Sequence, residues 1–595
     1  MPEILAPVSS QKHLKAAVNA GANAVYFGVE NYNARAFANN FTLENAQKAI
    51  AFAHENGVLV YITMNILLSD REMQKALDLT VSLHNMGADA FIIQDEGFAA
   101  LLNINYPEIR LHASTQMSVL NADSVLRLEK IGFKRVVLGR ELSFLDIEQI
   151  KKKTNIELEV FVHGSLCMSV SGQCYFSSVL GQRSGNRGKC AQPCRLAYRI
   201  NNKYAYPLSL KDLYTGAGVD KLSKIGVRSF KIEGRMKRPE YVYEAVRAYV
   251  KHDFSDKTQK RLDELFSRGG FTDGYLNDKL GRSMFGIRSN TQKEQAAITV
   301  KKTDINKIII KRKELKQNKR EILESVTLPD LSNRSMNKSP DLWLAFNKFA
   351  QIPKDIDKYK AKKIFIDFQE AKLNSKRMDY NKHGVYLPFF IRESKTDEFY
   401  KTLKSMADSG LRYVMCSNTG QVLRAQELGL EVLTDYRFNI FNSYSLQKIS
   451  NDNVAAAVLS FETNFGQIND LHRSVSFGIL AYGYLPLMIF RNCIIQSFNS
   501  NGNCEKACTS SFKITDRKNI KFDIAKGYDC SNILYNSRPL YTPDMKNIQR
   551  IGLDFFLLQF TLEDKAETER IVSDFIAKRT NTHEYTRGLY NKGLG

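Results

Sequence analysis

Four cysteines lie close together in the first half of the chain, where their thiols could act as metal ligands or as nucleophiles. Cys167, Cys174, Cys190 and Cys194 follow the spacing C-x6-C-x15-C-x3-C. Structural zinc sites favour paired cysteines about two to four residues apart, whereas iron–sulfur clusters tolerate looser spacing and take thiolates at all four positions. The spacing favours an iron–sulfur site over a zinc site and leaves both open.

A cysteine nucleophile is the alternative chemistry for the same stretch. His163 lies shortly before Cys167 and could act as its general base. Nothing else in the sequence indicates a catalytic triad, because the chain has only nine histidines and "AHENG" (53–57) lacks the second histidine of a zinc-protease helix.

The second half carries its own group of four cysteines. They are Cys493, Cys504, Cys508 and Cys530, and they leave Cys416 as a single cysteine that we interpret as a small buried residue. An odd number of cysteines in a chain with no secretory signal is typical of a reducing, cytoplasmic compartment, where clustered thiols are more often metal ligands or catalysts than disulfides. The second quartet is therefore a second candidate metal site.

Composition indicates the kind of partner. The 595 residues include 85 lysines and arginines against 63 acidic residues, so the net charge is +22. A charge of this size favours a polyanion such as RNA. The most basic stretch is 301–320, in which we expect a short strand at "KIIIK" and phosphate contacts from Lys311, Arg312 and Lys313. No apolar run reaches the ~18 residues that a membrane span needs.

The elements that must position these groups alternate in type over the first 235 residues. Eight short runs rich in Val, Ile, Phe and Tyr alternate with amphipathic stretches that end in glycine, which is typical of β/α units and predicts a (β/α)8 barrel. Active sites in that fold lie where the strands end. The polar residues at these ends are Glu30, Asn65, Asp95, His112, Gln116, Arg140, Glu141, His163, Glu233 and Arg235. Many of them would simply solvate loops or cap helices.

The second half repeats the first at an offset near 320. "VVLGREL" (136–142) matches "AVLSFET" (457–463), so that Glu141 pairs with Glu462, and "KDLYT" (211–215) matches "RPLYT" (538–542). We therefore predict an α/β protein of two tandem TIM-barrel-like domains. The expected boundaries are 1–265, a Gly-rich connector with a basic β-rich segment at 266–335, and a diverged second barrel at 336–595.

The stretch around the first cysteines resembles the signature of the collagenase-like peptidase family (peptidase family U-thirty-two). The matching residues are Glu159, Phe161, Gly164, Ser165, Leu166, Cys167, Gly172, Cys174 and Ser177. Phe176 replaces an expected aliphatic residue, and "FKIEGRMKRPEYV" (230–242) is also similar to the family. The match runs through about the first 290 residues, and the second half is similar to family members that lack the signature.

The resemblance implies an iron–sulfur enzyme of oxygen-independent hydroxylation more than a peptidase. It implies a 4Fe–4S cluster on Cys167, Cys174, Cys190 and Cys194, an RNA pyrimidine as substrate and a prephenate-like oxygen donor. Within the family the chain most resembles ribosomal RNA cytidine hydroxylases. We expect His112, Gln116, Arg140 and Glu141 to line the pocket, with Arg140 binding a donor carboxylate.

Two other functions stay open from the sequence. One is a peptidase that uses Cys167 with His163 or a bound metal, and the other is an RNA-binding protein with a structural metal site. The repeat also predicts a monomer whose two halves form an internal pseudo-dimer.

Overall fold

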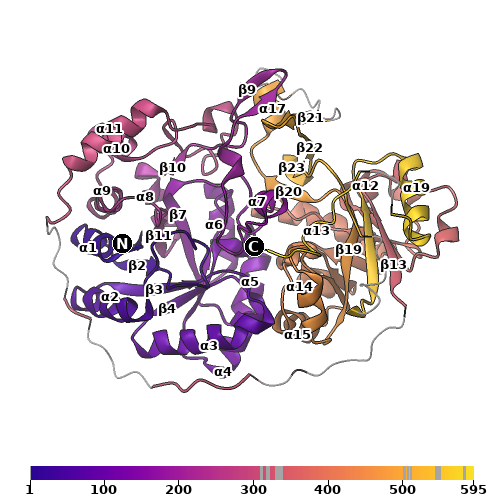
Figure 1. Cartoon of the computed structure of the whole chain (residues 1–595), viewed down its shortest axis with the longest axis horizontal. Coiled ribbons are helices and arrows are strands. Elements are labelled where there is room, and N and C mark those ends of the chain that lie inside the picture. The colour runs from indigo at the N-terminus through magenta and orange to yellow at the C-terminus, as the bar shows by residue number, and fades with distance from the viewer. Residues whose placement is uncertain are drawn as a thin grey trace.

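Eight parallel strands close into a barrel in each half of the chain (Figure 1). The structure is a computed structural model that describes residues 2–307, 313–315, 322–328, 331, 339–499, 504, 508, 512–542, 551–580 and 584–594. The prediction of tandem barrels is confirmed.

The first barrel is closed by pairing between its seventh and eighth strands in chain order. Its strands are β1 (Glu3–Pro7), β2 (Ala24–Phe27), β3 (Leu59–Met64), β4 (Ala90–Ile93), β5 (Leu111–Ala113), β6 (Arg135–Val137), β7 (Glu157–Ser165) and β11 (Ser229–Ile232). Helices that cover it include α1 (Gln11–Asn19), α2 (Leu43–Glu55), α3 (Asp70–Asn85), α4 (Glu96–Asn105), α5 (Ala122–Ile131), α6 (Phe144–Lys153), α8 (Val219–Ile225) and α9 (Pro239–Lys251).

Local sequence explains where these helices begin and end. Ser69 and Glu72 form a capping box at the start of α3, and Ser143 and Asp146 form another at α6. Helix α5 ends at Gly132, whose positive φ of 112° is open to glycine at little cost. Each helix buries one apolar face on the strands, which are themselves almost fully buried.

The second barrel follows the same order. Its strands are β13 (Asp341–Phe346), β14 (Lys363–Asp367), β15 (His383–Tyr386), β16 (Tyr413–Cys416), β17 (Glu431–Thr434), β18 (Ala456–Val458), β19 (Ser476–Gly483) and β25 (Phe555–Phe560). Its helices include α12 (Phe368–Leu373), α13 (Glu393–Asp408), α14 (Gly420–Glu427), α15 (Ser443–Asn451), α16 (Phe465–Asp470) and α19 (Lys565–Ile576).

Irregular features recur in both barrels at matching places. The register of β7 against β11 slips between Phe161 and His163, and that of β19 against β25 slips between Leu480 and Tyr482. A short antiparallel strand then pairs with the end of each: β10 (Asp212–Tyr214) with β7, and β24 (Leu540–Tyr541) with β19. These are the "KDLYT" and "RPLYT" segments, so the internal repeat extends to the details of the backbone.

The barrels pack on one another through equivalent helices, with approximate two-fold symmetry. Helix α4 packs on α15, and α5 packs on α14. The amide of Asn121 donates to the carbonyl of Ile391, and the equivalent Asn442 donates to the carbonyl of Leu68. Arg127, almost fully buried, pairs with Glu96 of its own barrel and Asp452 of the other, each at 2.6 Å. The contact is therefore built like an isologous dimer interface within one chain.

A third sheet joins the two halves, in the order β20-β23-β22-β21-β8-β9. Its strands are β8 (Tyr198–Ile200), β9 (Lys203–Ala205), β20 (Pro486–Phe490), β21 (Phe512–Thr515), β22 (Lys521–Lys526) and β23 (Asn532–Tyr535), all antiparallel. The first two follow the first cysteine quartet, and the other four surround the second. The β-rich region thus comes from the cysteine segments.

The predicted basic β-rich insert has a different structure where it is described. Between residue 273 and residue 339 the described residues contain helix α11 (Asn290–Lys301) and no strand; β12 (Phe271–Thr272) pairs with β10 at the start of the connector. The expected strand at "KIIIK" falls on Ile308–Lys311, outside the described residues. None of the described helices is long and apolar enough to cross a membrane.

The interface between the barrels predicts a steric test. A Cβ added at Gly97 would lie 2.3 Å from the backbone nitrogen of Ser445, whereas one at Gly181 would meet nothing within 4 Å. Because the close atom is backbone, we expect Gly97→Ala to cost about 1–3 kcal/mol and to lower the thermal midpoint. Gly181→Ala is the matched control, since both glycines are helical. Equal midpoints for the two variants would contradict the packing.

Candidate functional site

The first cysteine segment begins at the mouth of the first barrel. Strand β7 ends at Ser165, and Cys167 follows two residues later. The first barrel holds the segment through Arg187, whose guanidinium is 2.6 Å from the carboxylate of Glu72, and through the carbonyl of Gly188, which accepts from the N–H of Ala36. The segment is thereby fixed to the loop that follows β2.

The second repeat holds the same segment from the other side, through strand β20 of the third sheet and through the second barrel. The N–H groups of Val170 and Tyr175 donate to carbonyls of β20, at 2.8 and 2.9 Å. The amide of Gln173, beside Cys174, donates to the carbonyl of Arg437. Further along, Asn186 donates to the buried carboxylate of Glu462 at 3.1 Å. The first cysteine site is therefore assembled from both repeats.

The four thiols of this segment are neighbours. Cys174 lies within electrostatic reach of Cys190, Cys194 and Cys167. Burial raises the pKa of Cys194 to about 11 and raises that of Cys174 well above its ordinary value, and nearby thiolates add to both shifts. A bound cation would reverse this and stabilise the thiolates. Among the described residues, no three His, Cys, Asp or Glu side chains are arranged around a single ion position.

Several arginines surround the thiols. Arg35 lies within electrostatic reach of Cys167 and Cys190 and is 3.6 Å from the carboxylate of Glu233. Arg195 follows Cys194 directly and donates to the carbonyl of Leu166 at 2.7 Å. The mouth is therefore cationic, which suits an anionic ligand.

Arg235 is the most deeply buried of these arginines. It is 4% exposed, and its guanidinium donates to Asn33, Asn40 and Thr63, all uncharged. Burial lowers its pKa to about 10. Within the described part of the chain its Nε has no hydrogen-bond partner. A buried cation with neutral partners retains the capacity to bind an anion.

Two of the predicted pocket residues lie at this mouth. The amide of Gln116 donates to the carbonyl of Asn65 at 2.5 Å and to Gln94 at 3.0 Å. The guanidinium of Arg140 lies 4.0 Å from the ring centroid of Phe161 and donates to the carbonyl of Ser165, two residues before Cys167. Their predicted roles in binding remain predictions.

His112 lies inside the barrel instead of at its rim. Its ring packs edge-on against Tyr61, with centroids 4.8 Å apart, and Arg110 donates to it from the amino-terminal side of β5. Burial lowers its pKa well below the ordinary value, and Arg135 adds to this effect. The expected position beside the thiols is therefore corrected.

His163 faces away from the mouth because of the bulge in β7. Glu159 and Phe161 point into the barrel, where both approach Lys231, and the extra residue at Val162 reverses the alternation. The ring of His163 packs among Tyr241, Tyr249, Tyr214 and Phe271 at 5.6–5.9 Å. Neither ring nitrogen has a partner among the described residues, so no Cys167–His163 pair forms.

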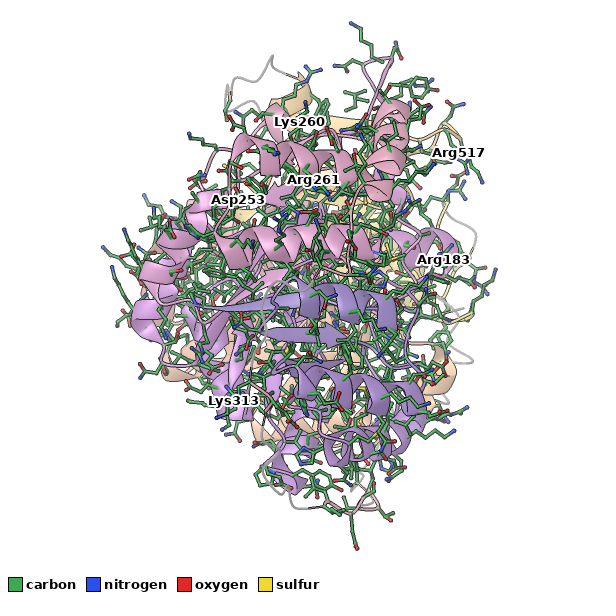
Figure 2. All side chains as sticks on the ribbon, turned by 90° about the vertical axis from the view of Figure 1, so that its left-hand side faces the viewer. Arg183, Asp253, Lys260, Arg261, Lys313 and Arg517 are labelled. Carbon is green, nitrogen blue, oxygen red and sulfur yellow. The ribbon has the colours of Figure 1, made fainter. Side chains whose placement is uncertain are left out.

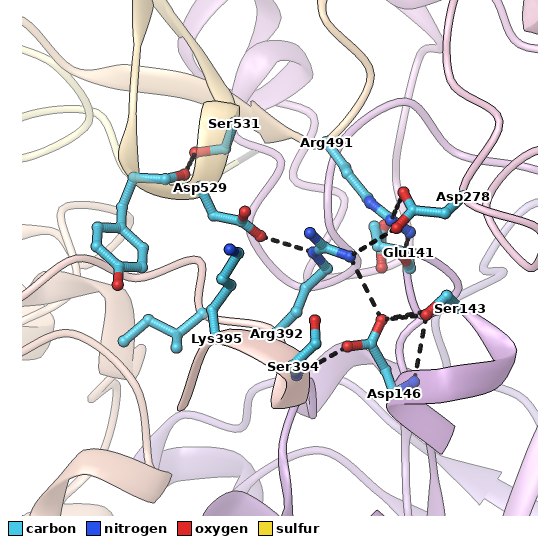
Figure 3. A network of polar contacts seen from close by, with 12 residues as sticks. Glu141, Ser143, Asp146, Asp278, Arg392, Ser394, Lys395, Arg491, Asp529 and Ser531 are labelled. Carbon is cyan, nitrogen blue, oxygen red and sulfur yellow. Dashed lines mark hydrogen bonds and ion pairs between the residues drawn. The ribbon is translucent and has the colours of Figure 1, made fainter. Parts of the chain in front are cut away.

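Glu141 lies at the contact with the second repeat (Figure 3). Arg491, from the segment that follows β20, donates to its backbone carbonyl and pairs with Asp278. Burial raises the pKa of the Glu141 carboxyl to about 7. Glu141 and Glu462 are therefore equivalent in the two repeats, because each contacts the cysteine segment of the other repeat.

The second quartet is partly assembled around Cys493. Cys493 lies within electrostatic reach of Cys508 and accepts from the amide of Asn532, two residues after Cys530, at 3.8 Å. Asp529 beside Cys530 is held by Arg392 at 2.6 Å (Figure 3). Cys504 and Cys530 are exposed. Whether the four converge on one site remains a prediction.

The described residues in and after the basic segment lie on the opposite face of the first barrel from the thiols. Ile305, Leu315, Leu323 and Glu324 contact the carboxyl ends of four barrel helices, at Asn19, His54, Asn85 and Tyr106. Helices run antiparallel to the strands, so these ends mark the amino-terminal face. Lys313 is on this side (Figure 2), and Lys311 and Arg312 lie outside the described residues. Phosphate contact by Lys311, Arg312 and Lys313 therefore remains a prediction, and by Lys313 it would take place away from the thiols.

Sequence reasoning missed Arg35 and Lys237. Arg35 lies in the connection between Phe27 and Leu43, which is long for a β/α loop. Long loops in compact domains are often functional, so the length of this loop could have indicated a site residue. Lys237 follows the strand-end residue Arg235, and burial lowers its pKa to about 8 while Asp212 and Glu233 oppose the shift.

The model of one known family, described as peptidase family U32, matches residues 9–284 and 366–576. The chain belongs to peptidase family U32. The two matches fall on the two barrels, so the second half is a diverged copy of the same family domain. Relatives of this chain are named either for RNA hydroxylation or for proteolysis, and membership of the family does not decide between these two activities.

Three curated relatives carry names of these two kinds. The chain is 39% identical over 281 residues to "23S rRNA 5-hydroxycytidine C2501 synthase" of Escherichia coli, covering 46% of this chain and 42% of that protein. It is 37% identical to "Collagenase" of Porphyromonas gingivalis (47% and 74%), and 35% identical to "tRNA hydroxylation protein P1" of Bacillus subtilis (42% and 62%). The chain thus spans less than half of the Escherichia coli protein.

The burial of His163 among aromatic rings predicts that the protein is less stable at acidic pH. The pKa of His163 falls from 6.5 to about 3 on folding, chiefly through burial. Below pH 6.5 the unfolded state takes up a proton that the folded state refuses, so stability falls as pH falls. At pH 5 the cost is about 2 kcal/mol. Urea unfolding at pH 7.5 and pH 5 should show a smaller loss for His163→Phe than for wild type. An identical loss in both proteins would contradict this burial.

Proposed function

We propose that this U32 protein is an iron–sulfur-dependent RNA hydroxylase that acts without molecular oxygen on a pyrimidine base. The observation that carries the proposal is the gathering of four thiols from one loop at a cationic barrel mouth. The favoured product is 5-hydroxycytidine in large-subunit ribosomal RNA, in line with the name of the Escherichia coli relative. The net charge of +22 supports a polyanionic substrate.

The thiols of Cys167, Cys174, Cys190 and Cys194 would hold a 4Fe–4S cluster, which supplies redox chemistry when bound. The donor set fits such a group, because four thiols are neighbours on one loop and thiolates are the ligands that iron–sulfur clusters take. The second barrel contributes by fixing the backbone on either side of Cys174 through β20 and Arg437.

The arginines would bind an anionic co-substrate such as a prephenate-like dicarboxylate. Arg140 and Arg235 have free donor capacity at Nε among the described residues, and guanidinium groups bind carboxylates in bidentate fashion. The second barrel has no cation at the position of Arg235, and its Arg437 is paired with Asp435. Counting from the paired residues Ile232 and Leu558, Thr561 stands where Arg235 does. The chemistry is therefore assigned to the first barrel.

The observed geometry disfavours proteolysis by a Cys–His pair. The candidate base His163 is enclosed by four aromatic rings, and neither ring nitrogen has a partner in the described structure. A thiol nucleophile requires a base within hydrogen-bond reach.

Metal analysis tests the cofactor. Anaerobically purified protein should be brown, with about four iron and four sulfide per filled quartet. Cys174→Ser should abolish the contribution of the first quartet, and Cys530→Ser that of the second if it is filled. Cys416→Ala is the control, since Cys416 is fully buried on β16 in the second barrel and should leave the metal content unchanged. One zinc per protein without sulfide would contradict the cluster.

Nucleoside analysis tests the reaction. Mass spectrometry of ribosomal and transfer RNA from a deletion strain should show complete loss of one hydroxylated pyrimidine. Wild-type protein should restore the modification and Cys174→Ser should not, whereas His163→Phe should restore at least half of it.

An unchanged nucleoside profile in the deletion strain would contradict RNA hydroxylation. If His163→Phe folds normally and restores nothing, His163 would again be a candidate general base.

A further inference from the structure

The six-stranded sheet forms a platform next to the first thiols. Its inner face buries Tyr198, Ile200, Phe522 and Ile524. Phe176, which starts helix α7 (Phe176–Gly181) two residues after Cys174, packs between Tyr198 and Phe522 at 6.2 and 5.6 Å. The platform is therefore fixed to the segment that carries the cysteines.

The outer side of the sheet is basic. Exposed cations extend along β21, β22 and the turn between them: Lys513, Arg517, Lys518 and Lys521. The carboxylates nearby are engaged locally. Asp523 pairs with Lys513 at 3.1 Å, and Asp516 accepts from the backbone of its own turn. The face thus carries an excess of positive charge.

Exposed aromatic rings occur at two places in the described structure: in the loop whose Ala36 donates to Gly188, two residues before Cys190, and on the β8–β9 hairpin that follows Cys194. Tyr204 on β9 is 69% exposed, and Phe37 in the loop after β2 is 58% exposed. Every other phenylalanine, tyrosine and tryptophan in the described residues is less exposed. Solvated aromatic rings are costly to leave bare, so their restriction to the edges of one site indicates a ligand with flat apolar faces.

The ring of Phe37 is held in place by neighbouring residues and leaves one face open for stacking. The guanidinium of Arg183 lies 4.8 Å from its ring centroid, and Nε of Arg183 donates to the carbonyl of Lys189 at 3.0 Å. The loop itself is fixed by the hydrogen bond from Ala36 to Gly188. Arg183 and Arg517 lie along the same side of the molecule, away from Lys313 (Figure 2).

We propose that this surface, from the Phe37–Arg183 pair across the quartet to Tyr204 and the basic outer face of the sheet, binds a single-stranded segment of RNA. The inference rests on the proposed function and specifies its substrate as unpaired RNA. Unpaired bases stack on exposed rings and their phosphates bind lysine and arginine, whereas paired bases in a duplex present no free face. The strand lies across the thiols, so that one base reaches the mouth of the first barrel.

Fluorescence anisotropy with the full chain tests the surface. The probes are a labelled 12-nucleotide RNA of mixed sequence and the same strand annealed to its complement. Wild type should bind the single strand at least tenfold more tightly than the duplex. Phe37→Ala and Tyr204→Ala should each weaken single-strand binding about 5- to 100-fold. Lys521→Glu should reduce the slope of log K against log salt by about 0.7.

Matched controls lie on the opposite face. Ile104→Ala removes a side chain that is 74% exposed at the carboxyl end of α4, and Lys134→Glu reverses an exposed charge directly before β6 on the same face. Both should bind like wild type. Wild-type affinity in Phe37→Ala and Tyr204→Ala, equal binding of duplex, or equal losses in the controls would overturn the surface while leaving RNA hydroxylation standing. No binding of either RNA by wild type would overturn both proposals.

Discussion

The hydrogen bonds between the first cysteine segment and strand β20 are the constraint on which the rest of the candidate site depends. A loop of this length, with glycines and no regular structure around Cys190, has little to order it alone. The second barrel supplies main-chain partners on both sides of Cys174 and a buried carboxylate at Glu462. The diverged repeat thus stabilises the geometry of the other half's chemistry, whatever its own cysteines hold.

The two repeats exchange these contacts. The segment of the second repeat reaches Glu141 through Arg491, and Arg392 connects Asp146 of the first barrel with Asp529 of the second. Both exchanges depend on the close packing of α4 on α15 and of α5 on α14, where Gly97 and Gly420 leave no room for a side chain. Because the contact is two-fold symmetric and within one chain, a duplicated family domain can retain one working mouth and use the other as support.

Charge distinguishes the two mouths. The first carries Arg35, Arg140 and Arg235 around its thiols, and the equivalent of Arg235 in the second is a threonine. Arg437 at the second mouth is paired with Asp435. A buried cation without a neutralising partner is costly unless a ligand neutralises it, and this asymmetry supports the proposal that anions bind at the first barrel. The exposed ring of Phe37 lies in the loop after β2, at the same mouth.

The sequence by itself determined the fold class, the duplication and the cysteine groups. Periodicity of apolar residues and glycine stops are local signals of β/α units, and collinear matches between "KDLYT" and "RPLYT" reported the repeat down to strands β10 and β24. Only the tertiary structure decided which strand-end residues share a site. One extra residue in β7 turned His163 out of the mouth, since a strand's faces alternate with period two and a bulge reverses them. Helix polarity placed Lys313 on the far face, and the docking of the barrels carried Glu141 to the second repeat. These are long-range contacts, and no local pattern of residues encodes them.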